Sequence, residues 1–203
     1  ELKPADKWIL SKVNTLAKDV TENMDKYEMG IAVQKVYDFI WDEFCDWYIE
    51  ITKTRTYNKE NDPASANAAF WTLKTVLTEA LKLLHPFMPF ITEELWQQMY
   101  EREEGESLMV CPLTINTYVD ADTIRQFEVV KEVISNIRSI RLQKNIAQKE
   151  PLTLQVVGEN PVAEFSAVIL KMCNLTAIDV VDAKTEGAAS FMVGTTEYAV
   201  PLG

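Results

Sequence analysis

Apolar residues recur every three or four positions in most of the first 145 residues, and this spacing constrains the fold more than any other feature. Between residues 5 and 26, Trp8, Ile9, Val13 and Leu16 follow it, with charged and polar residues between them. The pattern predicts an amphipathic helix there and further helices over residues 31–55, 63–84, 92–100 and 123–145. We therefore expect a mainly α-helical fold in this part of the chain.

The second and third of these helices have further signals of their own. Residues 31–55 carry apolar side chains around more than half of the helix circumference, which predicts a helix in the centre of an antiparallel bundle. Asp62-Pro63 places proline at the first position of the third helix, and His85-Pro86 ends that helix. Thr92 is expected to cap the short helix that follows.

The hydrophobic period changes after the fifth helix. Alternating or continuous β-branched runs predict strands at 152–157 and 177–181, with a helix over 161–173 between them. Two more candidate strands, 190–193 and 198–200, flank a turn at Gly194. We therefore expect an antiparallel helical bundle over residues 1–115, then a small α+β subdomain over residues 116–203.

Composition restricts the compartment and the partners. The net charge of −11, from 20 basic and 31 acidic residues, argues against nucleic-acid binding through the field of the whole chain, although a local basic patch remains compatible with it. Three cysteines without a paired or metal-ligand spacing exclude a disulfide framework and a zinc site and favour a reducing compartment. No signal peptide or membrane span is predicted, and the chain begins without Met, so we expect a fragment.

Candidate catalytic groups are few. The single histidine, His85, lies beside Pro86 at a helix break, where a structural role is expected. The adjacent carboxylates Glu43 and Asp46, or Glu93 and Glu94, are typical of a solvated helix face or an N-terminal cap. The sequence contains no glycine-rich phosphate loop and no nucleophile or metalloprotease motif, so no catalytic residue and no metal ligand is predicted.

Two basic groups stand out from the acidic background. Lys53, Arg55 and Lys59 follow Trp47-Tyr48, and this pairing of cations with aromatic rings is typical of sites for phosphates and unstacked bases. Two readings remain open, because the rings also suit a protein core and the cations also suit a helix C-terminus.

The second basic group lies on the fifth helix. Lys131, Arg138, Arg141 and Lys144 share one side of it at spacings of seven, three and three. A basic helix side of this kind is compatible with a contact to an RNA backbone and equally with a solvated helix face.

Two long motifs make the chain recognisable. DFIWDEFCDWYIEITK over residues 38–53 and LLHPFMPFITEELW over residues 83–96 closely resemble the anticodon-binding domain of valyl-tRNA synthetases. ADKWILSKVN, SLMVCP and IRSIRLQKNI extend the resemblance along the chain. The isoleucine and leucine enzymes share a looser form of these motifs.

The resemblance implies a class I aminoacyl-tRNA synthetase, in which a catalytic domain activates valine with ATP and Mg²⁺ and charges its tRNA in the cytoplasm. The family's ATP signatures, HIGH and KMSKS, are absent from this sequence, so the chain is expected to be non-catalytic, without a cofactor of its own. Its expected partners are valine tRNA and the catalytic and editing domains of the same polypeptide, with no membrane and no metal.

The resemblance also assigns roles to residues. In the family, the stretch matching WYIEITK faces the anticodon loop, so Trp47, Ile49, Lys53 and Arg55 are expected to contact RNA. Ile49 would touch a base, while Lys53 and Arg55 would bind phosphates. Two alternatives remain: a helical protein-interaction module, which the acidic charge favours, and the equivalent domain of an isoleucine-type or leucine-type enzyme.

Overall fold

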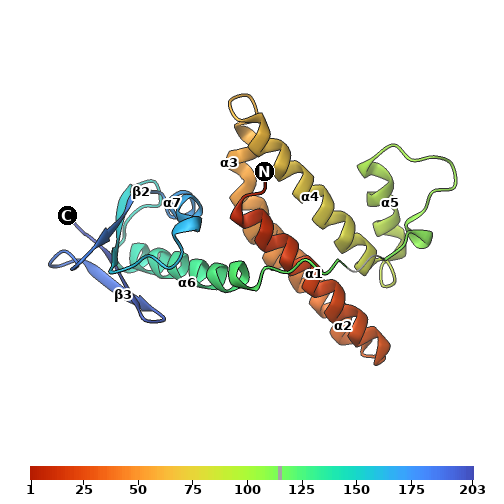
Figure 1. Ribbon diagram of the computed structural model, residues 1–203, viewed down its shortest axis with the longest axis horizontal. Helices are drawn as coiled ribbons and strands as arrows, with labels where there is room; N and C mark the ends of the chain where they lie inside the picture. The colour runs from red at the N-terminus through yellow and green to blue at the C-terminus, as the bar shows by residue number, and fades with distance from the viewer. Residues whose placement is uncertain (114–115) are drawn as a thin grey trace. The chain divides into compact units, whose positions relative to one another are not determined.

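Helices fill the first part of the protein and a small sheet lies near its end, as a computed structural model of residues 1–113 and 116–203 shows (Figure 1). The described chain forms two compact units, Glu1–Ala121 and Asp122–Gly203. The expectation of a mainly α fold with an α+β part is confirmed. The boundary expected near residue 115 falls outside the described residues.

The first unit is built on three long antiparallel helical stretches and a shorter helix. Its helices are α1 (Pro4–Asp25), α2 (Met29–Asp38), η1 (Phe39–Ile49), α3 (Glu50–Tyr57), α4 (Pro63–Leu84), α5 (Pro89–Met99) and the short η2 (Leu108–Val110). Helices α2, η1 and α3 follow one another without a break, and α1 and α4 both pack against this long stretch and against each other (Figure 1). The periodicity therefore predicted both ends of each of these three stretches to within two residues.

The middle of the second stretch differs from the prediction. In η1 the backbone follows the wider π-helical spacing, which side-chain periodicity does not reveal. The stretch is also less enclosed than its apolar content predicts, since Tyr37 and Trp41 are more than half exposed and stack on each other with ring centroids 6.4 Å apart. Its buried side is formed by residues that include Val36, Phe44 and Tyr48.

The helix ends follow local chemistry. Pro63 begins α4, and the Asp62 carboxylate accepts a hydrogen bond from the Ser65 amide at 3.1 Å, as expected of an N-cap. Helix α5 begins at Pro89, three residues before the predicted start. The prediction that Thr92 caps it is wrong, because Thr92 is buried inside the helix and its hydroxyl donates to the Met88 carbonyl at 2.8 Å.

A small core joins α5 to α4. Leu81, Trp96 and Leu108 are buried together, and Leu77, Met99 and Cys111 pack around them. The Glu93 carboxylate accepts a hydrogen bond from the Leu108 amide at 2.9 Å, which holds the segment after α5 in place. Hydrogen bonds from Gln97, Leu108 and Ser107 lower the pKa of Glu93, so this carboxyl has a structural role in holding the segment after α5.

The second unit is a helix–sheet layer. It contains α6 (Ala121–Gln143), β1 (Leu152–Val157), η3 (Ala163–Phe165), α7 (Ser166–Cys173), β2 (Leu175–Val181), β3 (Ala189–Val193) and β4 (Thr196–Val200). The strand order is β2-β1-β4-β3, with β1 parallel to β2 and the other pairs antiparallel. The β1-α7-β2 crossover and the β3-β4 hairpin confirm the predicted strands. Gly194, at φ +60°, supplies the left-handed conformation that the hairpin turn requires.

Candidate nucleic-acid interface

The predicted contact residues of the first unit lie along η1 and α3. Trp47 and Ile49 are half-buried near the end of η1, and Lys53 follows one turn later on α3. The Lys53 ammonium pairs with the Glu50 carboxylate, and this hydrogen bond raises the pKa of Lys53. Lys53 is thus a fixed, solvent-facing cation, with 43 % of its side chain exposed.

Sequence reasoning missed one aromatic residue in this region. Tyr57 lies four positions after Lys53, on the same side of α3, and is 81 % exposed. Its neighbours Asn58 and Lys59 are also exposed. The sequence does contain a signal for this exposed ring. Tyr57 is surrounded by Thr, Asn and Lys residues, with no apolar neighbours to form a core around it. The end of α3 therefore presents to solvent the Tyr57 ring, the Lys59 cation and the Lys53 cation, which is paired with Glu50.

Arg55 has a different environment. Its guanidinium donates to both oxygens of the Asp6 carboxylate, at 2.6 and 2.9 Å, and to the Ser65 hydroxyl at 2.8 Å. Asp6 is completely buried, and the Tyr48 hydroxyl donates to it at 2.6 Å. This network ties α3 to α1 and α4. The phosphate role expected of Arg55 is therefore corrected, because its donors serve the protein interior.

The second basic group does not share one exposed side. Arg141 is 1 % exposed, and its guanidinium donates to the carbonyls of Ala147 and Cys173, each at 2.8 Å. Its expected contact with an RNA backbone is corrected for the same reason as that of Arg55. Arg138 and Lys144 are exposed, while Lys131 is mostly covered, with its ammonium 5.7 Å from the centre of the Phe127 ring. Helix α6 thus retains two exposed cations of the four.

The remaining reactive groups have structural partners or raised thiol pKa values. His85 Nδ1 lies 2.8 Å from the Thr92 hydroxyl, at the turn between α4 and α5. Burial raises the pKa of the Cys173 thiol to about 11, and burial together with Asp46 raises the pKa of Cys45. Within residues 1–113 and 116–203, no group of three or more His, Cys, Asp or Glu side chains is arranged to hold a metal ion.

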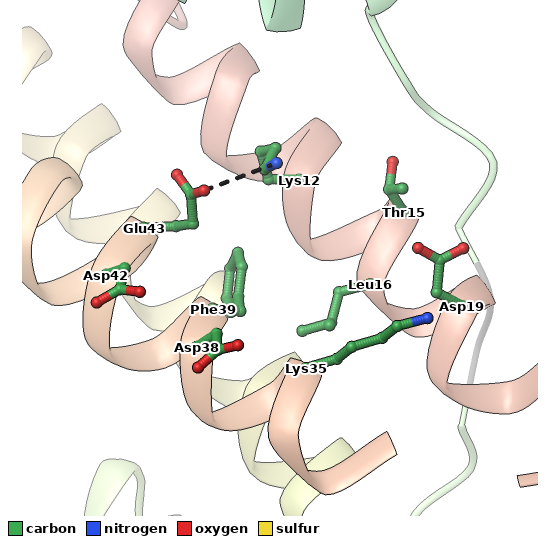
Figure 2. Close-up of a pocket in the computed structure, with 9 residues that line it drawn as sticks. All are labelled: Lys12, Thr15, Leu16, Asp19, Lys35, Asp38, Phe39, Asp42 and Glu43. Carbon is green, nitrogen blue, oxygen red and sulfur yellow. Dashed lines mark ion pairs between the residues drawn. The ribbon is translucent and has the colours of Figure 1, made fainter. Parts of the chain in front are cut away.

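A hollow of about 270 Å³ between α1 and the α2–η1 stretch has the wrong charge for RNA (Figure 2). Four of its lining residues are acidic: Asp19, Asp38, Asp42 and Glu43. Figure 2 shows the ion pair between Lys12 and Glu43, whose nitrogen and oxygen lie 3.8 Å apart. Glu43 therefore has an ion-pair partner within the protein.

Comparison with known proteins identifies the family. The family described as "Anticodon-binding domain of tRNA ligase" matches residues 6–157, which is most of the chain. The chain belongs to this anticodon-binding family. The match begins at the buried Asp6 and ends at the last residue of β1, so this anticodon-binding domain includes both basic groups described above.

Relatives of the domain carry a more specific name. The chain is 62 % identical to the valine–tRNA ligase of Bacteroides thetaiotaomicron over 198 residues, 97 % of this chain and 22 % of the relative. It is 53 % identical to that of Phocaeicola vulgatus and 40 % identical to that of Porphyromonas gingivalis, over 98 % of this chain and 22 % of each relative. The domain thus spans about a fifth of the length of these relatives. No helix in its described residues is long and apolar enough to cross a membrane.

Proposed function

We propose that the chain recognises the anticodon stem and loop of valine tRNA as part of a valine–tRNA ligase. The observation that carries the proposal is the match of residues 6–157 to the anticodon-binding family, together with 62 % identity to a valine–tRNA ligase. An exposed ring and two cations at the end of α3 fit this function, because unstacked bases and phosphates are bound by such groups.

The contacts are proposed along η1 and α3. Lys53 binds a phosphate, Ile49 touches a base edge, and Trp47 supports the surface between them. Tyr57, exposed beside Lys53, supplies a face on which a loop base stacks. Arg55 acts indirectly by holding α3 against α1 through Asp6.

Helix α6 is proposed to contribute sequence-independent contacts. Arg138 and Lys144 are exposed and suit the backbone of the anticodon stem, and Lys131 offers a weaker contact because Phe127 and Glu128 engage it. Such contacts fix orientation and affinity without reading bases.

The reaction of the whole polypeptide is part of the same proposal. It attaches valine to tRNA in the cytoplasm, using ATP and Mg²⁺ at a catalytic domain. In the family that this chain resembles, the catalytic domain carries the motifs HIGH and KMSKS. Neither motif occurs in this sequence. The proposed partners of this chain are therefore valine tRNA and the catalytic and editing domains of its own polypeptide.

The proposal is tested by a fluorescence anisotropy titration of the chain against valine tRNA, with isoleucine tRNA as competitor, at two salt concentrations. We expect preference for valine tRNA and an affinity that falls steeply with salt. Preference for isoleucine tRNA indicates the isoleucine-type domain instead. No RNA binding at either salt concentration contradicts the proposal and favours a protein-interaction module.

A further inference from the structure

A second hollow, which we name the α4–α5 hollow, has a different character from the acidic one. It measures about 310 Å³ and is lined by residues that include Trp71, Lys74, Lys82, Trp96, Tyr100 and Arg102. Three of its lining side chains are basic and one, Glu79, is acidic, in a chain whose net charge is −11. None of these residues belongs to the contact surface proposed above.

The fold explains why these side chains meet. Trp71, Lys74, Thr78 and Lys82 recur at helical spacing and therefore share one side of α4. The buried contact of Trp96 with Leu81 fixes α5 against α4. Tyr100 and Arg102 lie just beyond the last residue of α5, so the same packing brings them beside that side of α4.

Cations and rings alternate within the hollow. The Arg102 guanidinium lies over the Trp96 indole, 3.6 Å from the ring centre, and also 5.2 Å from the centre of the Tyr100 ring. The Lys74 ammonium lies 4.8 Å from the centre of the same Tyr100 ring. Lys82 is partly neutralised by Glu79, at 3.2 Å. Lys74 and Arg102 have no carboxylate partner in the described part of the chain, so their positive charge remains available.

Trp71 forms the edge of the hollow. It is 55 % exposed, although other α4 residues such as Ala69 and Val76 are buried, and it also lines a neighbouring, more apolar hollow with Leu10, Val13 and Tyr118. A large exposed indole between two hollows, with an uncompensated lysine one turn away, is the combination that binds nucleobases through stacking and phosphates through charge.

We propose that the α4–α5 hollow binds one unstacked nucleotide of the tRNA, with its base on Trp71 and its flanking phosphates on Lys74 and Arg102. The proposal rests on the proposed function and adds a second RNA contact to it. RNA is favoured over a protein segment because an apolar partner on Trp71 would bury Lys74 and Arg102 without a counter-charge, which is unfavourable, whereas phosphates supply one.

Matched variants test this assignment. We would measure the anisotropy of labelled valine tRNA with wild-type chain, Trp71→Leu, Trp71→Phe and Lys74→Gln. The controls are Tyr27→Leu, an exposed aromatic residue (87 %) between α1 and α2 and outside the hollow, and Lys18→Gln, an exposed lysine on α1. A thermal melt of each variant checks that it is folded. Trp71 and Lys74 are exposed, so we expect their variants to fold.

Stacking predicts that Trp71→Leu weakens binding by roughly 5-fold to 100-fold, while Trp71→Phe stays within about 3-fold of wild type. Lys74→Gln should weaken binding several-fold and reduce the salt slope by about 0.7 to 0.9. Both controls should bind like wild type.

Two other outcomes are distinguishable. If wild type binds valine tRNA but Trp71→Leu and Lys74→Gln bind equally well, the hollow is not an RNA site and the proposed function stands without it. If wild type binds no tRNA, the proposed function and this assignment are both overturned.

Discussion

Asp6 is a carboxylate without solvent contact, so only protein groups can stabilise its negative charge. Arg55 supplies two hydrogen bonds and Tyr48 a third. Burial, followed by the charge of Asp6, raises the pKa of Tyr48, so the tyrosine remains a protonated donor. The Lys3 amide also donates to Asp6, at 2.9 Å, which adds the start of α1 to the network. The buried Asp6 thus joins α1 to the α2–η1–α3 stretch, and Arg55 extends the network to α4 through the Ser65 hydroxyl.

Replacing Arg55 is predicted to act on stability. Arg55→Ala leaves Asp6 buried without its counter-charge and should lower the free energy of unfolding by about 3–5 kcal/mol, measured by urea denaturation. Lys18→Ala, at an exposed position, is the control and should change it little. A stable Arg55→Ala variant whose tRNA salt slope falls by about 0.9 would contradict the network and restore Arg55 as a phosphate contact.

The thiol of Cys173 gives a prediction for pH. With a pKa of about 11, the thiol is only about 0.1 % ionised at pH 8, so alkylation by iodoacetamide should be slow in the native chain and fast in urea. The neutral thiol is favoured by the fold, so its stabilising effect is complete below its ordinary pKa of 9.0 and is lost as the pH rises through 11. Fast native alkylation of Cys173 that levels off below pH 9 would show that burial does not raise this pKa.

At the scale of elements, periodicity and proline predicted most of the helices and strands. Leu152–Val157 is a strand as predicted. Its run of apolar and β-branched residues is too short to form a helix of ordinary length. The predicted start of α5 at residue 92 was three residues late, because Pro89 is compatible with a first helical turn and the helix begins there. Sequence spacing cannot decide whether a proline begins a helix or precedes it.

Roles that depend on distant partners were not predictable. Arg55 and Asp6 are 49 positions apart, and Arg141 and Cys173 are 32 apart. Helical spacing placed Arg141 beside Arg138 but gave no sign that carbonyls would enclose the Arg141 guanidinium, while Arg138 lies at an exposed position. Tyr57 was missed for the opposite reason, since an aromatic residue is usually assigned to the core.

The end of α6 provides a matched pair of variants. Arg141→Ala removes hydrogen bonds to the carbonyls of Ala147, Glu150 and Cys173 and leaves these groups poorly satisfied, so unfolding should become easier by about 3 kcal/mol or more. Lys144→Ala, three positions away and exposed, should change stability by less than about 0.5 kcal/mol. Equal thermal stability of the two variants would exclude the anchoring role of Arg141.

The end of α3 is predicted to act on RNA affinity without affecting stability. Lys53→Ala should weaken binding to valine tRNA and reduce its salt slope by about 0.7 to 0.9, the value for one lost phosphate contact. Tyr57→Ala should weaken binding by roughly 5-fold or more with an unchanged slope, because stacking carries no charge. Both variants are titrated at several salt concentrations. If neither the affinity nor the salt slope changes, Lys53 and Tyr57 do not contact the RNA.

At the scale of the molecule, the distribution of charge matters more than its sum. The chain carries −11 overall, yet the hollow beside α1 gathers acidic residues and the α4–α5 hollow gathers basic ones. Since charges are screened over roughly 8 Å at physiological salt, a polyanion can bind a local basic surface on an acidic protein. Each of the two units has its own buried core, around residues such as Trp8 in the first and Phe127 in the second.

An anticodon transplant tests the central claim most directly. The valine anticodon is placed in isoleucine tRNA and the isoleucine anticodon in valine tRNA, and the affinity of the chain for both is compared with that for the parent tRNAs. We predict that affinity follows the anticodon, so that isoleucine tRNA gains tight binding and valine tRNA loses it. Affinity that follows the tRNA body, whichever anticodon it carries, would contradict anticodon recognition by this domain.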